Sequence, residues 1–271
     1  MAVEHYENFP VASILLPKHL RRPVEIIYRF ARQADDFADE GSMANEERLA
    51  KLDGFRAELE RIANHGYPQT PLFLDVADIV TEYRLPLQLF HDLLDAFTQD
   101  VMKKRYANFD ELLDYCRRSA NPVGRLLLHL YKQASPQNLL YADSICSALQ
   151  LINFWQDVKK DYAIGRIYLP QDEMAQFGVA EQHIAQGRAN AEWRDLMRFQ
   201  IDRAAAMMKQ GAPLGSILTG RTGLEMRMII AGGYRIIDKL RGVNFDIFER
   251  RPVLQMHDWV IMLMRSAPFS F

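Results

Sequence analysis

The sequence predicts an all-α protein, and three observations support this. Helical periodicity dominates almost the whole chain of 271 residues, and no convincing set of alternating strands accompanies it. Gly and Pro are sparse and gather at intervals, as they do between helices. At 49% hydrophobic residues, the chain can bury a sizeable core. No linker, low-complexity tract or repeat interrupts the pattern, so we expect a single domain over residues 1–271.

Taken in order, the periodic segments predict a series of helices separated by short turns. Ser135 followed by Pro136 is typical of a helix start, since serine caps the first turn and proline fits within it. The Gly and Pro clusters that mark turns lie at residues 64–71, 121–124, 165–170 and 211–215. The predicted helices span residues 22–40, 44–63, 72–83, 86–104, 107–119, 122–134, 136–162, 189–210, 221–242 and 252–265.

Composition excludes several classes of protein. Lys and Arg together number 33 against 35 for Asp and Glu, without the basic excess of a nucleic-acid binder. Two cysteines, Cys116 and Cys146, favour a reducing compartment over a disulfide scaffold. The first residues lack the features of a signal peptide, and the apolar run at 259–264 is far shorter than a membrane span. We therefore expect a cytoplasmic protein, with peripheral membrane contact left open.

A narrow polar stripe runs along the predicted helix at 136–162. At about 100° per residue, Gln150, Asn153, Asp157 and Asp161 fall within an arc of roughly 80°. Apolar side chains cover much of the remaining circumference. A solvated helix usually has a broad polar face instead. Bare carboxylates in such a setting need either water or a cation beside them.

The predicted helix at 22–40 repeats this design. Tyr28, Arg32, Asp35 and Asp39 follow one another at spacings of four, three and four, so they share a face. Apolar residues such as Phe30 lie around that face, and Asp36 and Glu40 flank it.

Paired carboxylates of this kind are suited to Mg²⁺. Side chains four residues apart on a helix lie about 5–6 Å from each other, so two carboxylates there repel unless a cation joins them. Mg²⁺ prefers hard oxygen ligands and is commonly completed by water and substrate phosphate. Two such helices facing each other would hold several Mg²⁺ ions around a diphosphate, with Arg32 and Arg166 sharing the charge. An ordinary exposed acidic patch, or a set of surface ion pairs, stays open as the alternative.

At this point the sequence resembles a known family. The segments DDFAD (35–39), QLINFWQDVKKD (150–161) and GRIYLP (165–170) are similar to the two aspartate motifs of squalene/phytoene synthases. The resemblance extends from HYENFPVAS (5–13) to FDIFERRP (245–252). Within the family the chain is most similar to the hydroxysqualene synthases of bacterial hopanoid biosynthesis.

The resemblance implies a fold and a reaction. The fold is the helical bundle of isoprenoid synthases, also called terpenoid synthases, with a central cavity where two aspartate helices bind Mg²⁺ and a prenyl diphosphate. The reaction is ionisation of presqualene diphosphate, rearrangement of the cation and release of hydroxysqualene after water capture. Functional coupling to other enzymes of the hopanoid pathway follows from this implication. The sequence has no Gly-rich loop after a strand, so a dinucleotide cofactor has no support.

Roles carry over by position. The resemblance implies that Asp35, Asp39, Asp157 and Asp161 bind metal, and that Tyr115 acts in catalysis together with Asp35 and Asp157. Expected substrate-binding residues, from the resemblance and the two stripes together, are Asn8, Phe9, Tyr28, Arg32, Gln150, Asn153, Arg166 and Tyr168.

Three departures from the family pattern bear on the reaction. Gln156 stands where many relatives have Arg, Asn121 and Pro122 replace a stretch of small residues, and Gly233 stands where several relatives have Tyr. These changes argue more against condensation of two farnesyl diphosphates than against ionisation of one bound diphosphate. Two alternatives stay open: head-to-head condensation of prenyl diphosphates to presqualene-, squalene- or phytoene-type products, and a catalytically silent helical assembly factor.

Overall fold

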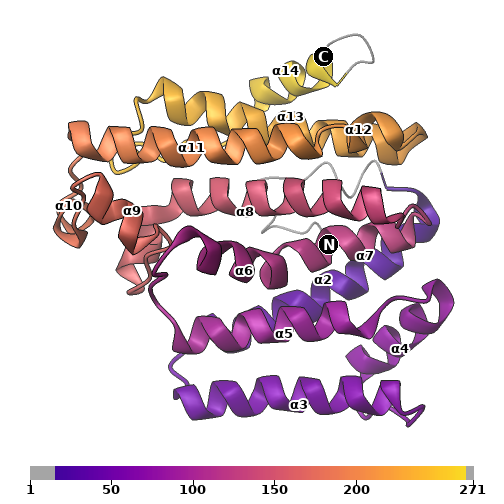
Figure 1. The fold of residues 1–271 in the computed structure, drawn as a ribbon. Helices are drawn as coiled ribbons and strands as arrows, with labels where there is room; N and C mark the ends of the chain where they lie inside the picture. Colours follow the sequence, from indigo (N-terminus) through magenta and orange to yellow (C-terminus); the bar gives the residue numbers. More distant parts are fainter. Residues whose placement is uncertain (1–15, 267–271) are drawn as a thin grey trace. The chain divides into compact units, whose positions relative to one another are not determined.

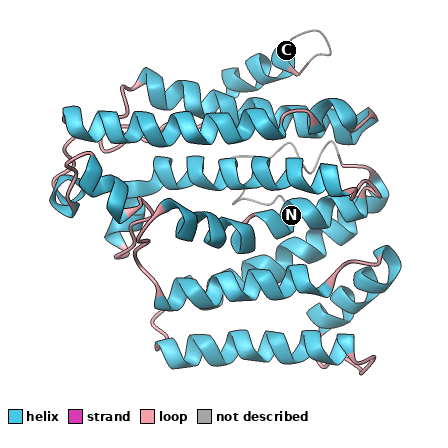
Figure 2. Ribbon diagram, in the orientation of Figure 1, coloured by secondary structure: helices cyan, strands magenta, loops and turns pink. Residues whose placement is uncertain are grey.

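The computed structural model describes residues 16–266, and these residues form thirteen helices and no strand. An isolated bridge between Arg105 and Ile167 is the β-type pairing among them. The all-α prediction is confirmed, as Figure 2 shows. The helices form two compact units, and both units are assembled from separated segments of the chain. No single cut of the sequence therefore separates them, and one domain over 1–271 stays a prediction.

The first unit, here the α2–α7 unit, contains Pro17–Lys103 and Asp114–Leu139. Four aromatic rings form its centre, with Phe30 in contact with Phe55, Phe73 and Phe90 at centroid distances of 5.5, 5.8 and 5.1 Å. Edge-to-face packing of this kind adds to the burial of apolar area. Its helices are α2 (Lys18–Asp39), α3 (Asn45–Ala63), α4 (Pro71–Tyr83), α5 (Leu87–Met102), the second half of α6 (Phe109–Ser119) and α7 (Asn121–Leu130).

The second unit, here the α8–α14 unit, contains Lys104–Leu113 and residues 140–266 of the described chain. Its long helices α8, α11 and α13 run alongside one another (Figure 1). Its helices are α8 (Pro136–Ala163) from residue 140 onward, α9 (Gln171–Gln176), α10 (Glu181–Ala185), α11 (Ala191–Gly211), α12 (Leu214–Ile217), α13 (Gly220–Gly242) and α14 (Met256–Arg265).

Two glycines allow these long helices to approach closely. A Cβ on Gly211 would lie 2.5 Å from Ile145 Cγ1 and 2.6 Å from the Tyr141 carbonyl oxygen of α8. A Cβ on Gly233 would lie 2.6 Å from Met208 Cε and 3.1 Å from Leu149 Cδ2. Position 233 therefore has no room for a side chain as large as Tyr unless its neighbours move.

Most predicted helices are confirmed to within a few residues, including the start of α8. There the Asn138 N–H donates to Ser135 Oγ at 3.2 Å, as expected of an N-cap. Two predicted starts are wrong. Helix α2 begins at Lys18 rather than at residue 22 and includes Pro23. Helix α14 begins at Met256 rather than at 252, because the residues up to Gln255 are extended.

Three short helices were missed by the sequence. Helices α9, α10 and α12 have six, five and four residues. A segment of less than two turns is too short to repeat an apolar position several times, so periodicity cannot detect it.

Candidate functional site

The polar stripe on α8 has the pattern that the sequence predicts. Gln150, Asn153, Asp157 and Asp161 are partly exposed. Their neighbours on the helix are buried: Leu151, Ile152, Phe154, Trp155, Gln156 and Val158. A helix buried on most sides and open along one stripe presents its polar groups in one direction. That stripe is the candidate site of the α8–α14 unit.

A cation lies against the first aspartate of this stripe. Arg251 donates from Nε to Asp157 Oδ1 at 2.6 Å and from Nη2 to Asp157 Oδ2 at 2.9 Å. This is a bidentate pair, the strongest form of carboxylate recognition by arginine. The two side chains are 21% and 22% exposed, so water screens the pair only in part. Residues 251–255 are not helical, and Arg251 contacts α8 from this extended segment.

The chain before α14 is fastened to α8, and this places Arg251. Gln156 is buried and donates from Nε2 to the Pro252 carbonyl at 2.6 Å. Lys159 donates from Nζ to the Phe248 carbonyl at 3.1 Å. Both partners lie about ninety residues further along the chain. Helical periodicity describes neighbours within one helix, so no sequence pattern could have found this contact.

The end of α8 and the following turn place the remaining predicted residues of this unit. The Arg166 N–H donates to the Asp161 carbonyl at 2.8 Å across a turn in which Gly165 has φ of 79°, a conformation that favours glycine. Tyr168 is buried, and its ring stacks on Phe154 at 3.7 Å and on Tyr106 at 5.6 Å between centroids. The ring of Tyr168 thus serves core packing, and its predicted contact with substrate stays a prediction.

On α2, the acidic stripe is more open to solvent. Arg32 lies 3.4 Å from Asp35 and 2.8 Å from Asp36, and its Nη2 contacts Glu40 at 2.5 Å. Asp39 is exposed, and Tyr28 is partly buried. The expectation of a stripe within an apolar cylinder is wrong for this helix, because α2 also has a broad exposed face: Arg21, Arg22, Glu25, Arg29 and Gln33.

Tyr115 has a buried partner that the sequence did not reveal. Its hydroxyl donates to Asp100 Oδ2 at 2.7 Å, and both residues are buried. Asp100 lies on α5 among apolar residues. A carboxylate in such surroundings is costly unless it is hydrogen-bonded, and the tyrosine supplies one such bond.

The predicted site residues are thus divided between the two units. Tyr28, Arg32, Asp35, Asp39 and Tyr115 belong to the α2–α7 unit. The α8–α14 unit contains Gln150, Asn153, Asp157, Asp161, Arg166 and Tyr168. Asn8 and Phe9 lie outside the described residues.

The donor set fits Mg²⁺ by its chemistry. Each of α2 and α8 offers two carboxylates four residues apart with at least partial exposure. Within residues 16–266, no three His, Cys, Asp or Glu side chains are gathered to hold a metal by themselves. Paired carboxylates suit an ion whose other ligands are water and phosphate, and the pairing of Asp157 with Arg251 shows that this position accepts positive charge.

Comparisons with known proteins identify the family of this chain. Residues 2–258 match the squalene/phytoene synthase family. A hydroxysqualene synthase of Zymomonas mobilis is 36% identical over 82% of this chain and 75% of its own length. A phytoene synthase of Arthrospira platensis is 34% identical, over 93% and 85%. Among solved structures, the squalene synthase HpnC of Alicyclobacillus acidocaldarius aligns with a TM-score of 0.84 and 34% identity, over 90% and 91% of the two chains.

Proposed function

Because the chain belongs to the squalene/phytoene synthase family, we propose that it converts presqualene diphosphate to hydroxysqualene in a Mg²⁺-dependent reaction. The C–O bond to diphosphate breaks, the cyclopropylcarbinyl cation rearranges, and water adds to it with loss of a proton. The products are hydroxysqualene and diphosphate.

The observation that carries the choice of reaction is the environment of position 156. The resemblance implies Arg here in many relatives, but Gln156 is buried and its amide donates to the Pro252 carbonyl. The position therefore offers no cation to a phosphate. The guanidinium of Arg251, whose neighbour Pro252 accepts from Gln156, is paired with Asp157. One phosphate contact fewer favours a reaction that ionises a single bound diphosphate over one that joins two.

The chain's own residues supply the charge and the apolar surroundings that this reaction needs. Asp35 and Asp39 on α2 and Asp157 and Asp161 on α8 would hold the metal. When bound, Mg²⁺ supplies Lewis-acid stabilisation of the departing diphosphate. The guanidinium groups of Arg32 and Arg251 stabilise the negative charge that grows on the leaving oxygens, provided they turn toward it from their present carboxylates.

A second candidate function is head-to-head condensation of two prenyl diphosphates. Its support is the phytoene synthase of Arthrospira platensis, whose 34% identity is close to the 36% of the hydroxysqualene synthase. A third candidate is a catalytically silent assembly factor. It requires that the four aspartates bind no metal.

Product analysis separates these candidates. Purified protein is given presqualene diphosphate or farnesyl diphosphate, each with and without Mg²⁺, and products are identified by mass spectrometry. We expect hydroxysqualene from presqualene diphosphate only when Mg²⁺ is present, and none from Asp157→Asn. Presqualene diphosphate or a phytoene-type product from prenyl diphosphates would favour the condensing candidate. Folded protein that turns over neither substrate would favour the silent one.

A further inference from the structure

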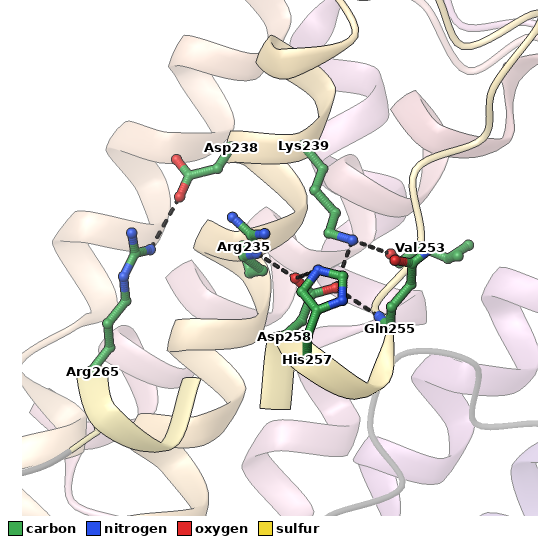
Figure 3. A network of polar contacts seen from close by, with 8 residues as sticks. All are labelled: Arg235, Asp238, Lys239, Val253, Gln255, His257, Asp258 and Arg265. Atoms are coloured by element: carbon green, nitrogen blue, oxygen red, sulfur yellow. Dashed lines mark hydrogen bonds and ion pairs between the residues drawn. The ribbon is translucent and has the colours of Figure 1, made fainter. Parts of the chain in front are cut away.

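The 251–255 segment, which carries Arg251 to α8, is also held by α13. Lys239 of α13 donates from Nζ to the Val253 carbonyl at 2.9 Å, and the same Nζ lies 2.6 Å from Asp258 Oδ2 (Figure 3). Val253 stands two residues after Arg251, and Asp258 lies in the first turn of α14. One ammonium group therefore joins the segment to the helix that follows it.

Asp258 has other partners that balance its charge. The carboxylate is fully buried, and Arg235 donates from Nε to its Oδ1 at 2.6 Å. The Gln255 N–H donates to its Oδ2 at 2.7 Å. Lys239 adds a second positive charge beside this single carboxylate, although it is only 17% exposed. A cation in this position needs another acceptor, and the Val253 carbonyl is that acceptor.

The backbone between the Lys239 contact and Arg251 has little freedom. Pro252 stands between Arg251 and Val253, and its ring fixes its own φ at about −65°. The residue before a proline is confined to extended conformations, and that residue is Arg251. Pro252 is buried, and its carbonyl accepts from Gln156 Nε2 at 2.6 Å. Fixing the Val253 carbonyl therefore limits the directions in which the Arg251 side chain can leave the backbone.

Helix α14 keeps other anchors when Lys239 is changed. It has ten residues, and none of the described helices is long and apolar enough to cross a membrane. On α14, Met262 is fully buried and packs against α13. At its far end Arg265 donates to Asp238 of α13 at 3.0 Å (Figure 3). A change at Lys239 therefore loosens the 251–255 segment without detaching α14.

We propose that Lys239 is a positioning residue for Arg251. By holding the Val253 carbonyl it fixes the 251–255 segment, and the segment keeps the Arg251 guanidinium against Asp157. The consequence for catalysis rests on the proposed function, in which this guanidinium turns to the departing diphosphate. The position of Arg251 itself does not depend on that function.

Exchange of the Arg251 Nε–H proton with solvent tests the proposal without metal or substrate. This proton is donated to Asp157 Oδ1. It is observed by NMR of the full chain with isotope-labelled arginine, and its signal is identified by its loss in Arg251→Gln. We expect Lys239→Met, which keeps the side-chain stem and removes the ammonium, to accelerate the exchange at least about fivefold, because the hydrogen bond opens more often. Lys239→Gln should act in the same direction.

The matched control is Arg235→Met. Arg235 lies four residues earlier on α13 and is 22% exposed, and its Nε donates to Asp258 rather than to the 251–255 segment. Arg235→Met and Lys239→Met should lower the free energy of unfolding by similar amounts, because each removes one cation from the same buried carboxylate. Only Lys239→Met should alter exchange at Arg251. Equal acceleration in both variants, or unchanged exchange in Lys239→Met and Lys239→Gln, would overturn the proposal.

Turnover of presqualene diphosphate with Mg²⁺ is measured on the same proteins. We expect Lys239→Met to lower kcat at least about threefold with a smaller change in KM, because a misplaced guanidinium stabilises the leaving group less well. Arg235→Met should keep the kcat of the unmodified chain. Faster exchange in Lys239→Met together with an inactive unmodified chain sinks the proposed function alone. An active unmodified chain whose Lys239→Met variant has unchanged exchange sinks this inference alone.

Discussion

At the scale of single residues, Arg251 determines which partner the Asp157 carboxylate of the α8 stripe has. Its guanidinium occupies both oxygens of Asp157, which a metal ion would otherwise share. Under the proposed function, metal binding at Asp157 competes with this bidentate ion pair. A diphosphate that arrives with the metal would offer the guanidinium a new partner and so link metal binding to substrate binding.

This competition is measurable without turnover. We expect Arg251→Gln to bind Mn²⁺, a spectroscopic substitute for Mg²⁺, roughly tenfold to a hundredfold more tightly in the absence of substrate, since a charge-assisted hydrogen bond contributes roughly 1.5–3 kcal/mol. The same variant should have lower kcat with substrate, because an arginine no longer stabilises the leaving group. Arg250→Gln, at the exposed neighbouring position, is the matched control. Unchanged Mn²⁺ affinity in Arg251→Gln would contradict the competition.

Tyr115 and Asp100 allow a structural role to be separated from a catalytic one. Tyr115→Phe removes the hydroxyl that donates to Asp100 Oδ2. Leaving a buried carboxylate oxygen without this hydrogen bond costs roughly 1–3 kcal/mol of unfolding free energy. If Tyr115 acts only in packing, Tyr115→Phe should lower the free energy of unfolding and leave kcat unchanged. We expect both to fall, with Asp100→Asn affecting stability more than kcat. Urea unfolding and steady-state kinetics on the two variants decide the matter.

The sequence identified one partner of these residue pairs but not the other. Asp157 lies in the second aspartate motif, and the resemblance singles out Tyr115. The contact of Asp157 with Arg251 and that of Tyr115 with Asp100 form only when the chain folds. Arg251 lies 94 residues from Asp157 and outside any helix, so helical periodicity does not relate the two residues.

At the scale of elements, Asp258 controls the attachment of α14. Burial opposes its ionisation, but hydrogen bonds from Lys239, Gln255 and Arg235 outweigh burial and lower its pKa from 3.8 to about 2. A carboxyl with a lowered pKa stabilises the fold above its unfolded pKa, and this contribution is lost as pH falls toward the folded value. The sensitive window therefore runs from about pH 4 down to about pH 2.

We predict the following pH dependence. The unmodified chain should lose about 2 kcal/mol of unfolding free energy from this group across the window, in addition to losses from other carboxyls. Asp258→Asn should be less stable at neutral pH and lack this part of the acid-induced loss. Urea unfolding at several pH values measures both. Parallel pH profiles for the two proteins would show that Asp258 has no such role.

The glycines of the long helices allow a second test at this scale. Gly211→Ala should destabilise by roughly 1–3 kcal/mol, because the new methyl group meets a backbone carbonyl that cannot easily shift. Gly54→Ala on α3 has nothing within 4 Å and should stabilise by roughly 0.5–1 kcal/mol through helix propensity. Thermal unfolding compares the two. A stabilised Gly211→Ala would mean that α8 and α11 are not closely packed there.

The long helices were the most predictable feature of this structure. Long amphipathic helices such as α11 repeat their apolar positions many times, so their existence follows from the sequence. The start of α14 could not be placed, because Gln255 and Asp258 define it through contacts with each other and with α13. The short helices α9, α10 and α12 depend on the chain around them.

At the scale of the whole molecule, the aspartates proposed to bind metal lie in both units, two on α2 and two on α8. The family match spans residues 2–258 and so includes segments of both units. Helical periodicity predicted the all-α fold, and the resemblance of the motifs predicted the family. The choice among reactions within the family depends on side chains that motifs do not describe, such as the buried amide of Gln156.

The most direct test of the central claim is the source of the product's oxygen. Presqualene diphosphate is incubated with the protein and Mg²⁺ in water enriched in heavy oxygen, and the product is examined by mass spectrometry. The account predicts hydroxysqualene whose hydroxyl carries the heavy isotope, because water captures the cation after diphosphate leaves. A hydrocarbon product without oxygen, or hydroxysqualene without the label, would contradict it.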